Sequence, residues 1–294
     1  MRILDLIKVL RTINSHPMNR KAPAVATFRF LKWQLSCMLN PYPVIYPFTD
    51  KAKLVLKKGM AGATGNLYCG LDEYHDMAFL LHFLRQGDLF VDVGANIGSY
   101  TVLAGAHVGA RVVAIEPISA TFEQLMQNIR LNNVQDSTTA LNIGIGGEPG
   151  TLTFTNNMDT VNHVTVDEGE GTISIPVDKL DNVLAELDPS LLKIDVEGFE
   201  NEVIRGGGGI LSKDSLKAII IELNGLSNRY GHNQFEVHKE LVEKGYEPFS
   251  YDPITRLLRP TKEGRQNTLY VKDLNYVQQR LITAEKVKVF NQLI

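Results

Sequence analysis

Hydrophobic positions along the chain fall into two kinds of segment that alternate. Short, continuous apolar runs predict buried strands at 88–93, 111–116, 138–143, 190–196 and 218–223. The stretches that carry apolar residues at helical spacing lie at 99–107, 119–132 and 199–211. Strands interleaved with helices predict a mostly parallel, doubly wound α/β sheet that is covered on both faces.

The segment before this alternation, residues 1–87, reads as a separate leader. Its pattern predicts one or two helices, a Pro- and Tyr-rich stretch at 41–48 and a strand at 51–58. The glycine-rich residues 59–66 favour a turn or mobile loop. Met77, Leu80, Leu81 and Leu84 recur at helical spacing, which predicts a helix over 72–86.

Two further regions interrupt or extend the alternation. Short Thr- and Val-rich runs between 150 and 177 predict an inserted β-hairpin. After 223 the pattern predicts a helix at 234–244, strands at 246–251 and 267–272, and a last helix at about 277–292. The last two strands have a short connection, so we expect an antiparallel pair at one edge. The expected organisation is a leader (1–87), a main domain (88–273) and a C-terminal helix (274–294).

A glycine-rich turn follows the first strand of the main domain, in the sequence FVDVGANIGSYT at 90–101. Gly94, Asn96 and Gly98 leave little side-chain bulk, so a ligand can lie close to the backbone at the start of a helix. Glu116 ends the next strand about twenty residues later, where an acid can reach both ribose hydroxyls of a nucleoside. A dinucleotide fingerprint needs G-x-G-x-x-G, but Asn96 and Ser99 stand where its second and third glycines would be. The turn therefore favours a nucleoside cofactor without phosphates.

A second motif, LLKIDVEGFENEVIRGG, spans residues 191–207. Asp195 and Glu197 stand at alternate positions at the exit of a buried strand, which we expect to lie beside strand 88–93. Alternate positions face the same side of a sheet. The two acids are therefore expected close to the glycine turn.

Together these stretches resemble the FkbM family of class I methyltransferases, which use S-adenosylmethionine (SAM). The resemblance rests on GDLFVDVGANIGSYT, AIEP, LxxNIRLNN, KLD, KIDVEGFENEVIRGG and IIIEL, over roughly residues 66–225. It implies a Rossmann-like, seven-stranded sheet whose last strand is antiparallel, and SAM as the cofactor. The residues expected to bind the cofactor are Asp92, Gly94, Asn96, Gly98, Tyr100, Glu116, Asn142 and Asp195. Similar sequences commonly carry an acid after the third strand, but this chain has Gly144 there, so we expect Asn142 or backbone amides at the adenine.

The resemblance implies methylation of a hydroxyl on a sugar, glycan or natural product. A hydroxyl is a weak nucleophile, so a general base assists by taking its proton. Asp195 and Glu197 are the candidate catalytic residues, because their proximity can raise one pKa toward neutrality. Asp195 could instead position the cofactor, and Glu197 could instead cap the following helix. Asp195, Glu222 and Asn224 could hold Mg²⁺, but no compact ligand motif supports a metal, and none is assigned.

Several other residues carry weaker indications of a role in the site. His163, His232 and His238 are alternative bases, although a lone histidine is more often a surface residue. Tyr68 and Glu73 precede the main domain, in a segment that the resemblance places over the site.

Charge and composition limit the kinds of partner and the cellular location that we expect for this protein. A net charge of −3 argues against binding nucleic acid through bulk phosphate attraction. Two cysteines are too few for a disulfide framework, which favours a reducing, cytoplasmic location. Residues 1–35 carry seven Lys or Arg against one acid, Asp5, on a first helix with an apolar face. That helix could contact an anionic membrane or a partner enzyme, or only pack on its own domain.

Three other functions remain open from the sequence. The methyl acceptor could be a nitrogen of a protein or nucleic acid, although no N/D-P-P-Y-type tetrapeptide follows strand 190–196. The fold could also be a non-catalytic scaffold, or an NAD-dependent oxidoreductase, which the broken dinucleotide pattern disfavours. The acceptor itself and the oligomeric state cannot be predicted.

Overall fold

A computed structural model describes residues 3–156, 162–165, 169–262 and 266–294. Its centre is an eight-stranded sheet in the order β12-β11-β13-β10-β9-β3-β4-β5. The parallel strands are β3 (Leu89–Val93), β4 (Arg111–Ile115), β5 (Thr138–Leu141), β9 (Leu191–Ile194) and β10 (Ala218–Leu223). β13 (Gln266–Val271) runs antiparallel to both β10 and β11 (Glu247–Asp252), which confirms the expected antiparallel pair.

The sheet has one strand more than the seven expected. The additional strand, β12 (Leu257–Pro260), forms a hairpin with β11 at the sheet edge. Most of its residues are exposed, so it has no continuous apolar run. Without β12, the order and the single antiparallel strand β13 are those of the class I methyltransferase fold.

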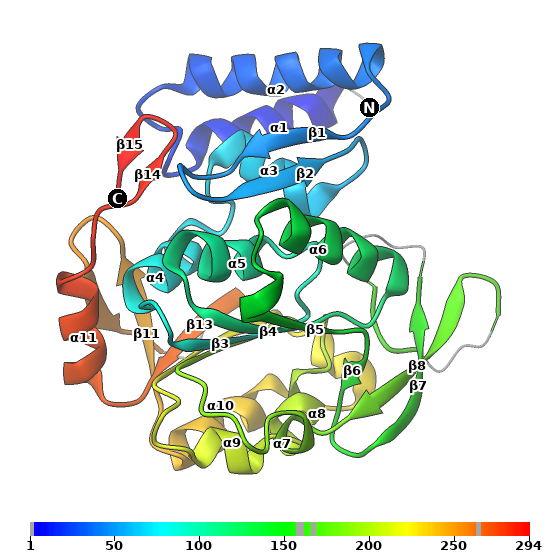
Figure 1. Cartoon of the computed structure of the whole chain (residues 1–294), viewed down its shortest axis with the longest axis vertical. Helices are drawn as coiled ribbons and strands as arrows, with labels where there is room; N and C mark the ends of the chain where they lie inside the picture. Colours follow the sequence, from blue (N-terminus) through cyan, green and yellow to red (C-terminus); the bar gives the residue numbers. More distant parts are fainter. Residues whose placement is uncertain (1–2, 157–161, 166–168, 263–265) are drawn as a thin grey trace.

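Helices cover both faces of the sheet, as the alternation predicts (Figure 1). One face carries α4 (Tyr74–Phe83), α5 (Ser99–Val102) with its π-helical continuation η1 (Leu103–Val108), and α6 (Ser119–Leu131). The other carries α7 (Leu180–Val183), α8 (Glu200–Arg205), α9 (Gly208–Ser212) and α10 (Gln234–Glu243). The helix predicted over 199–211 is broken at Gly206, where a Cβ would lie 2.1 Å from the carbonyl oxygen of Gly146.

The insertion forms a small second sheet in the order β6-β8-β7. β7 (Gly150–Thr155) and β8 (Thr172–Asp178) make the predicted hairpin, and β6 (Gly144–Ile145) adds a short parallel strand. Val164 of the middle Thr- and Val-rich run bridges to Phe154, whereas Val166 lies outside the described residues. The predicted strand 138–143 ends at Leu141, because the chain turns there into β6.

The leader contains α1 (Ile3–Ser15), α2 (Pro23–Leu39), a hairpin of β1 (Val44–Pro47) and β2 (Lys53–Leu56), and α3 (Ala61–Cys69). The prediction of a turn or mobile loop over 59–66 is wrong, because most of that segment is α3. Asn66 fixes this helix: its side-chain nitrogen donates to Ser99 Oγ at 3.1 Å, and its oxygen accepts from the amide of Asp72 at 3.0 Å. Packing against the main domain thus offsets the low helix propensity of the glycines.

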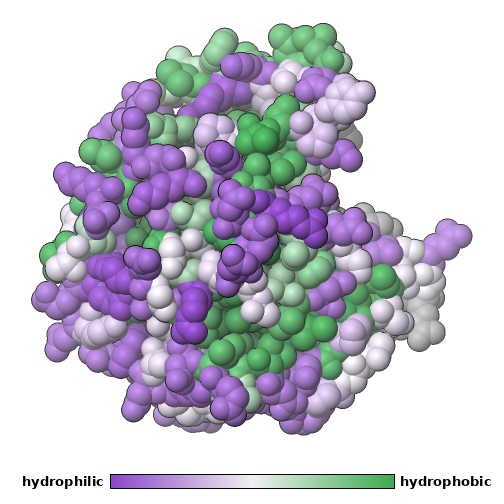
Figure 2. Space-filling model, in the orientation of Figure 1, coloured by the Kyte–Doolittle hydropathy of each residue, from purple (hydrophilic) through white to green (hydrophobic). Residues whose placement is uncertain are grey.

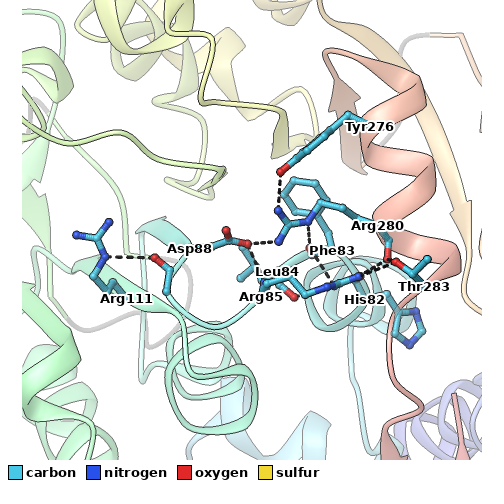
Figure 3. Close-up of polar contacts among 10 residues, drawn as sticks. His82, Phe83, Leu84, Arg85, Asp88, Arg111, Tyr276, Arg280 and Thr283 are labelled. Carbon is cyan, nitrogen blue, oxygen red and sulfur yellow. Dashed lines mark hydrogen bonds and ion pairs between the residues drawn. The ribbon is translucent and has the colours of Figure 1, made fainter.

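The C-terminal helix is shorter than predicted. α11 (Leu274–Ile282) begins early and is followed by a hairpin of β14 (Lys288–Val289) and β15 (Gln292–Leu293). Arg280 anchors α11 to the loop before β3: its guanidinium pairs with Asp88 and donates to the carbonyl of Phe83 at 2.8 Å (Figure 3). Beyond α11 the chain returns to the leader, where Gln292 donates to the carbonyl of Met18 at 2.6 Å. The residues after Ile282 therefore pack on the leader as a hairpin and not as a continuation of the helix.

Candidate active site

The glycine turn joins β3 to α5 at the carboxyl edge of the sheet. Gly94 has a φ of +81°, and a Cβ there would lie 1.8 Å from the carbonyl oxygen of Asp195. Only glycine therefore lets the turn lie so close to Asp195, the residue after β9, whose amide donates to the carbonyl of Val93 at 3.0 Å. Asn96 is also left-handed, with a φ of +52°. This tight turn exposes backbone to the space above the sheet.

Glu116 lies directly beside this turn, as the spacing predicts. Its two carboxylate oxygens accept hydrogen bonds from the amides of Asn96 and Ile118, each at 2.9 Å. Burial raises the pKa of Glu116 to about 7, although both amide bonds oppose that shift. Each oxygen keeps a second lone pair, so the carboxylate can still accept from a ligand's hydroxyls.

Two of the expected cofactor residues play a different part. The side-chain nitrogen of Asn142 donates to the carbonyls of Glu116 and Pro117, each at 2.8 Å, and Asn142 does not line the cavity. It supports the loop that carries Glu116, while Ile143 reaches the cavity instead. Gly98 also lies off the cavity, because it begins α5 and packs against Leu125.

A buried lysine lies at the centre of the polar floor. Lys193 stands on β9 opposite Asp92 of β3. Its ammonium lies 2.7 Å from Asp195 Oδ2 and 4.7 Å from the centre of the Tyr100 ring. Burial alone would lower the pKa of Lys193, but the charges of Asp195, Glu73 and Asp92 outweigh it and raise that pKa. The lysine is therefore a permanent cation among carboxylates.

Asp92 is the most deeply buried of these acids, with 1% of its surface exposed. One of its carboxylate oxygens accepts from the hydroxyl of Thr101 at 2.7 Å, and the other has no partner. Burial raises the pKa of Asp92 to about 6, against the opposing effects of Lys193 and Thr101. A buried carboxylate oxygen without a partner is uncommon, and Asp92 is among the residues that line the cavity.

Three carboxylates meet where β9 and β10 end. Asp195, Glu197 and Glu222 each place a carboxylate oxygen within 4.8 Å of the others. Burial, followed by the charges of Asp195 and Glu197, raises the pKa of Glu222 to about 8. Burial and then the charge of Asp195 raise the pKa of Glu197 to about 7. The structure thus brings the two predicted catalytic acids together and adds Glu222 to them.

Glu197 does not follow the predicted strand geometry. β9 ends at Ile194, and Glu197 has a left-handed φ of +54° in the loop that follows. It is not the cap of the next helix either, because Glu200 accepts from the amide of Gly198 at 3.0 Å. Its carboxylate is therefore free to serve the cavity.

The opposite wall comes from the start of α4. Asn267 on β13 donates to Glu73 Oε1 at 2.9 Å and to Asp76 Oδ2 at 3.2 Å. Burial, and next the charge of Glu73, raises the pKa of Asp76 to about 7. Glu73 lines the cavity, as the resemblance suggests, whereas Tyr68 does not and packs on Phe30.

These groups enclose a cavity of about 370 Å³, which is large enough for a small ligand. Its walls combine the glycine turn, the exits of β4, β9 and β10, α3 and α4 of the leader, and Phe154 of the insertion. The surface of the molecule is indented between the leader and the insertion (Figure 2). Seven acids line the cavity, and Lys193 is the one lysine or arginine among its described lining residues.

The histidines gain no support from this geometry, and the candidate metal ligands meet only in part: Asp195 and Glu222 lie together, but Asn224 is not with them. None of His163, His232 and His238 lines the described cavity. His232 lies 3.1 Å from Glu202, and His238 contacts the hydroxyl of Tyr270. Asn224 accepts from the amide of Leu226 and is not part of the acidic cluster. The spacing of Asp195, Glu197 and Glu222 is compatible with a cation, but Lys193 already pairs with Asp195, and the assignment of no metal stays a prediction.

The sheet order, the glycine turn and the acid on the neighbouring strand define a methyltransferase of the class I fold. A family model described as Methyltransferase FkbM domain matches residues 92–248. The chain belongs to this family of methyltransferases.

Individual relatives agree with this assignment. The hexuronic acid methyltransferase AglP of Haloferax volcanii is 30% identical over 148 residues, 49% of this chain and 59% of that protein. Methyltransferase sdnD of Sordaria araneosa is 27% identical and matches 45% of this chain and 65% of that protein. Methyltransferase 1 of Beauveria bassiana is 33% identical and matches 40% of this chain and 57% of that protein. The matched region thus spans between 57% and 65% of these relatives' lengths.

A similar solved structure is that of Methyltransferase FkbM from Methylobacillus flagellatus. It has a TM-score of 0.46 and 20% identity, and the comparison covers 70% of this chain and 52% of that one.

Proposed function

We propose that the protein is a SAM-dependent methyltransferase that methylates a hydroxyl of a sugar, glycan or natural product. The observation that carries this proposal is the placement of carboxyls with raised pKa values, Glu197 and Glu222, beside the glycine turn. Family membership supports methyl transfer, and AglP is a methyltransferase that its name assigns to a hexuronic acid.

The residues present fit SAM. Gly94 leaves room that any Cβ would fill, and Glu116 offers free lone pairs where a ribose could lie. The unpartnered oxygen of Asp92 and the acidic walls favour a cofactor that carries positive charge. When bound, SAM supplies a methyl group on a sulfonium, which is electrophilic without further activation.

The chain's remaining task is to position an acceptor oxygen and remove its proton. Positioning alone can lower the barrier by several kcal/mol. A general base works best when its pKa lies near the operating pH, and Glu222 and Glu197 meet that condition. Asp195 is held by Lys193 at 2.7 Å, so we assign it the role of orienting the other two carboxylates.

The charge of the cavity also restricts the acceptor. The acids that line the cavity include Asp72, Glu73 and Glu222. Among the described lining residues, Lys193 is the one lysine or arginine. A carboxylate or phosphate on the acceptor would find no free cation among these residues, because Lys193 is already paired with Asp195, and above the raised pKa values of the acids it would also meet like charge. We therefore expect a neutral hydroxylated acceptor to be preferred over a uronate.

Transfer of a labelled methyl group from SAM tests this function. The acceptor panel should contain neutral glycosides, the matching uronic acids, a pool of RNA and a pool of protein. We expect the native chain to place label on an oxygen of a neutral glycoside. Transfer should be strongly reduced in Glu222→Gln. It should be unchanged in the control Glu123→Gln, because Glu123 is an exposed acid on α6. Label confined to nitrogen of RNA or protein would instead support the alternative acceptor. SAM binding without transfer to any member of the pools would favour a scaffold.

A further inference from the structure

The leader presents an exposed row of large apolar side chains on one side of α2. We call this row the α2 apolar stripe: Phe28, Leu31, Leu35, Met38 and Leu39. The exposed fractions of these side chains range from 52% at Leu31 to 80% at Met38. Their spacing of three and four residues places them on a single helix face.

The rest of the leader packs against the other side of α2. Ala26 and Phe30 are buried against Ile13 of α1, and the Phe30 ring lies 5.2 Å from the Tyr68 ring of α3. α2 is the outermost helix of the leader in Figure 1. Hydrophobic residues reach the surface along this upper edge in Figure 2. The core of the domain therefore does not account for the stripe, and such a patch marks an interaction site.

Charge around the stripe indicates what it binds. α2 contains no Asp or Glu, and Lys32 lies within its exposed part. Lys8 and Arg11 of α1 and Arg20 and Lys21 of the connecting loop are also exposed. None of these five cations forms an ion pair within the described ranges.

This basic character is confined to the leader. Residues 1–58 carry eleven Lys or Arg against two acids, whereas the rest of the chain carries nineteen against thirty-one. The molecule thus has a basic end with an apolar stripe and an acidic body. An acidic body would be repelled by an anionic surface unless the basic end faced it.

We propose that the α2 apolar stripe binds an anionic lipid surface. α2 would lie in the plane of the interface, with its stripe at the boundary of headgroups and acyl chains and the cations among the headgroups. With 17 residues, α2 is about 25 Å long. No helix of the described residues is long and apolar enough to cross a bilayer.

Helix α3 lies between the α2 apolar stripe and the cavity. α2 packs on α3, and Asn66 and Gly62 of α3 line the cavity wall. Binding through the stripe would therefore place the α3 wall one helix layer from the lipid. An acceptor held at the membrane surface would be within reach of such an enzyme.

Vesicle co-sedimentation of the full chain tests this proposal. The probes are vesicles of phosphatidylcholine alone and of phosphatidylcholine with phosphatidylglycerol in equal parts. The test variant is Leu31→Asp/Leu35→Asp, and the control is Phe235→Asp/Val242→Asp on α10, at the opposite end of the molecule in Figure 1. The replaced side chains are comparably exposed, at 52% and 56% against 53% and 44%.

We expect the native chain to bind mixed vesicles at least about tenfold more strongly than neutral ones, with binding weakened by salt. The stripe variant should lose at least about tenfold in partitioning, whereas the α10 variant should bind as the native chain does. Circular dichroism and thermal melting confirm that both variants fold. Failure to bind mixed vesicles would overturn the proposal. So would equal loss in both variants, or self-association through the stripe without lipid, because the occupant would then be a second copy.

Discussion

Replacing Lys193 with methionine tests the buried charge arrangement beneath the cavity. Lys193 is 4% exposed, and its ammonium is the cation that faces Asp92 and Asp195. Methionine has a similar length, so the change removes charge with little change in packing. Asp92 and Asp195 would then lie together without compensation.

Removing one partner of a buried ion pair costs about 3–5 kcal/mol, because the other charge stays buried. Asp195 is partly exposed, so we expect Lys193→Met to lower the free energy of unfolding by about 3 kcal/mol at about pH 8, the lower end of that range. The pKa of Asp92, already raised to about 6 by burial, should rise further without the lysine. An acid whose folded pKa is raised loses stability as pH rises through that pKa, so the deficit should shrink by about 1 kcal/mol near pH 5.5.

Urea unfolding at the two pH values measures this deficit. Lys213→Met serves as the control, since it removes a more exposed ion pair with Asp188 and a hydrogen bond to the carbonyl of Leu187, and it should cost about 1 kcal/mol at either pH. Adding Asp92→Asn to Lys193→Met should recover part of the loss. The reasoning is refuted if Lys193→Met is as stable as the native chain at about pH 8, or if its deficit is independent of pH.

The remaining predictions concern the cavity. Gly94→Ala should lower the free energy of unfolding by at least about 2 kcal/mol and abolish SAM binding. The control is Gly59→Ala, which has a similar φ of +92° but open space around it, and it should lower the free energy of unfolding by about 1 kcal/mol. Equal losses would argue against the close contact. At about pH 8, above the raised pKa of Glu116, Glu116→Gln should weaken SAM binding about tenfold by calorimetry, because neutral hydrogen bonds to ribose replace charge-assisted ones. Unchanged affinity would remove Glu116 from the cofactor site. Transfer measured as kcat/KM should rise with pH toward about 8, as Glu222 loses its proton, and Glu222→Gln should abolish that limb. A native profile that is flat across this range would exclude Glu222 as the base.

Much of the sheet and the cofactor turn could be predicted, because both are set by local sequence. Continuous apolar runs marked the parallel strands, and the turn at Gly94 with Glu116 one strand later has a specific spacing. The neighbouring position of β9 followed from the topology rules of doubly wound sheets. Residues brought together by these rules, Asp195 and Glu197, do meet.

Other features of the structure depend on contacts between residues that are distant in sequence. Nothing local shows that glycine-rich 61–69 becomes a helix, because Asn66 is fixed by Ser99 and Asp72. The role of Lys193 needs the strand register that sets it opposite Asp92. A lysine inside the apolar run LLKIDV was the available signal, since an unpaired cation is rarely buried. The hydrogen bonds that hold Asn142 on the loop of Glu116, away from the cavity, also cannot be read from sequence.

The central claim is that the cavity between the glycine turn and Glu222 holds SAM. Isothermal titration of the folded full chain with SAM and with S-adenosylhomocysteine tests it most directly. We predict saturable binding of both at one site per chain, weakened in Glu116→Gln and lost in Gly94→Ala while Gly59→Ala binds normally. A folded chain that binds neither compound, or a Gly94→Ala variant that binds both as the native chain does, would contradict it.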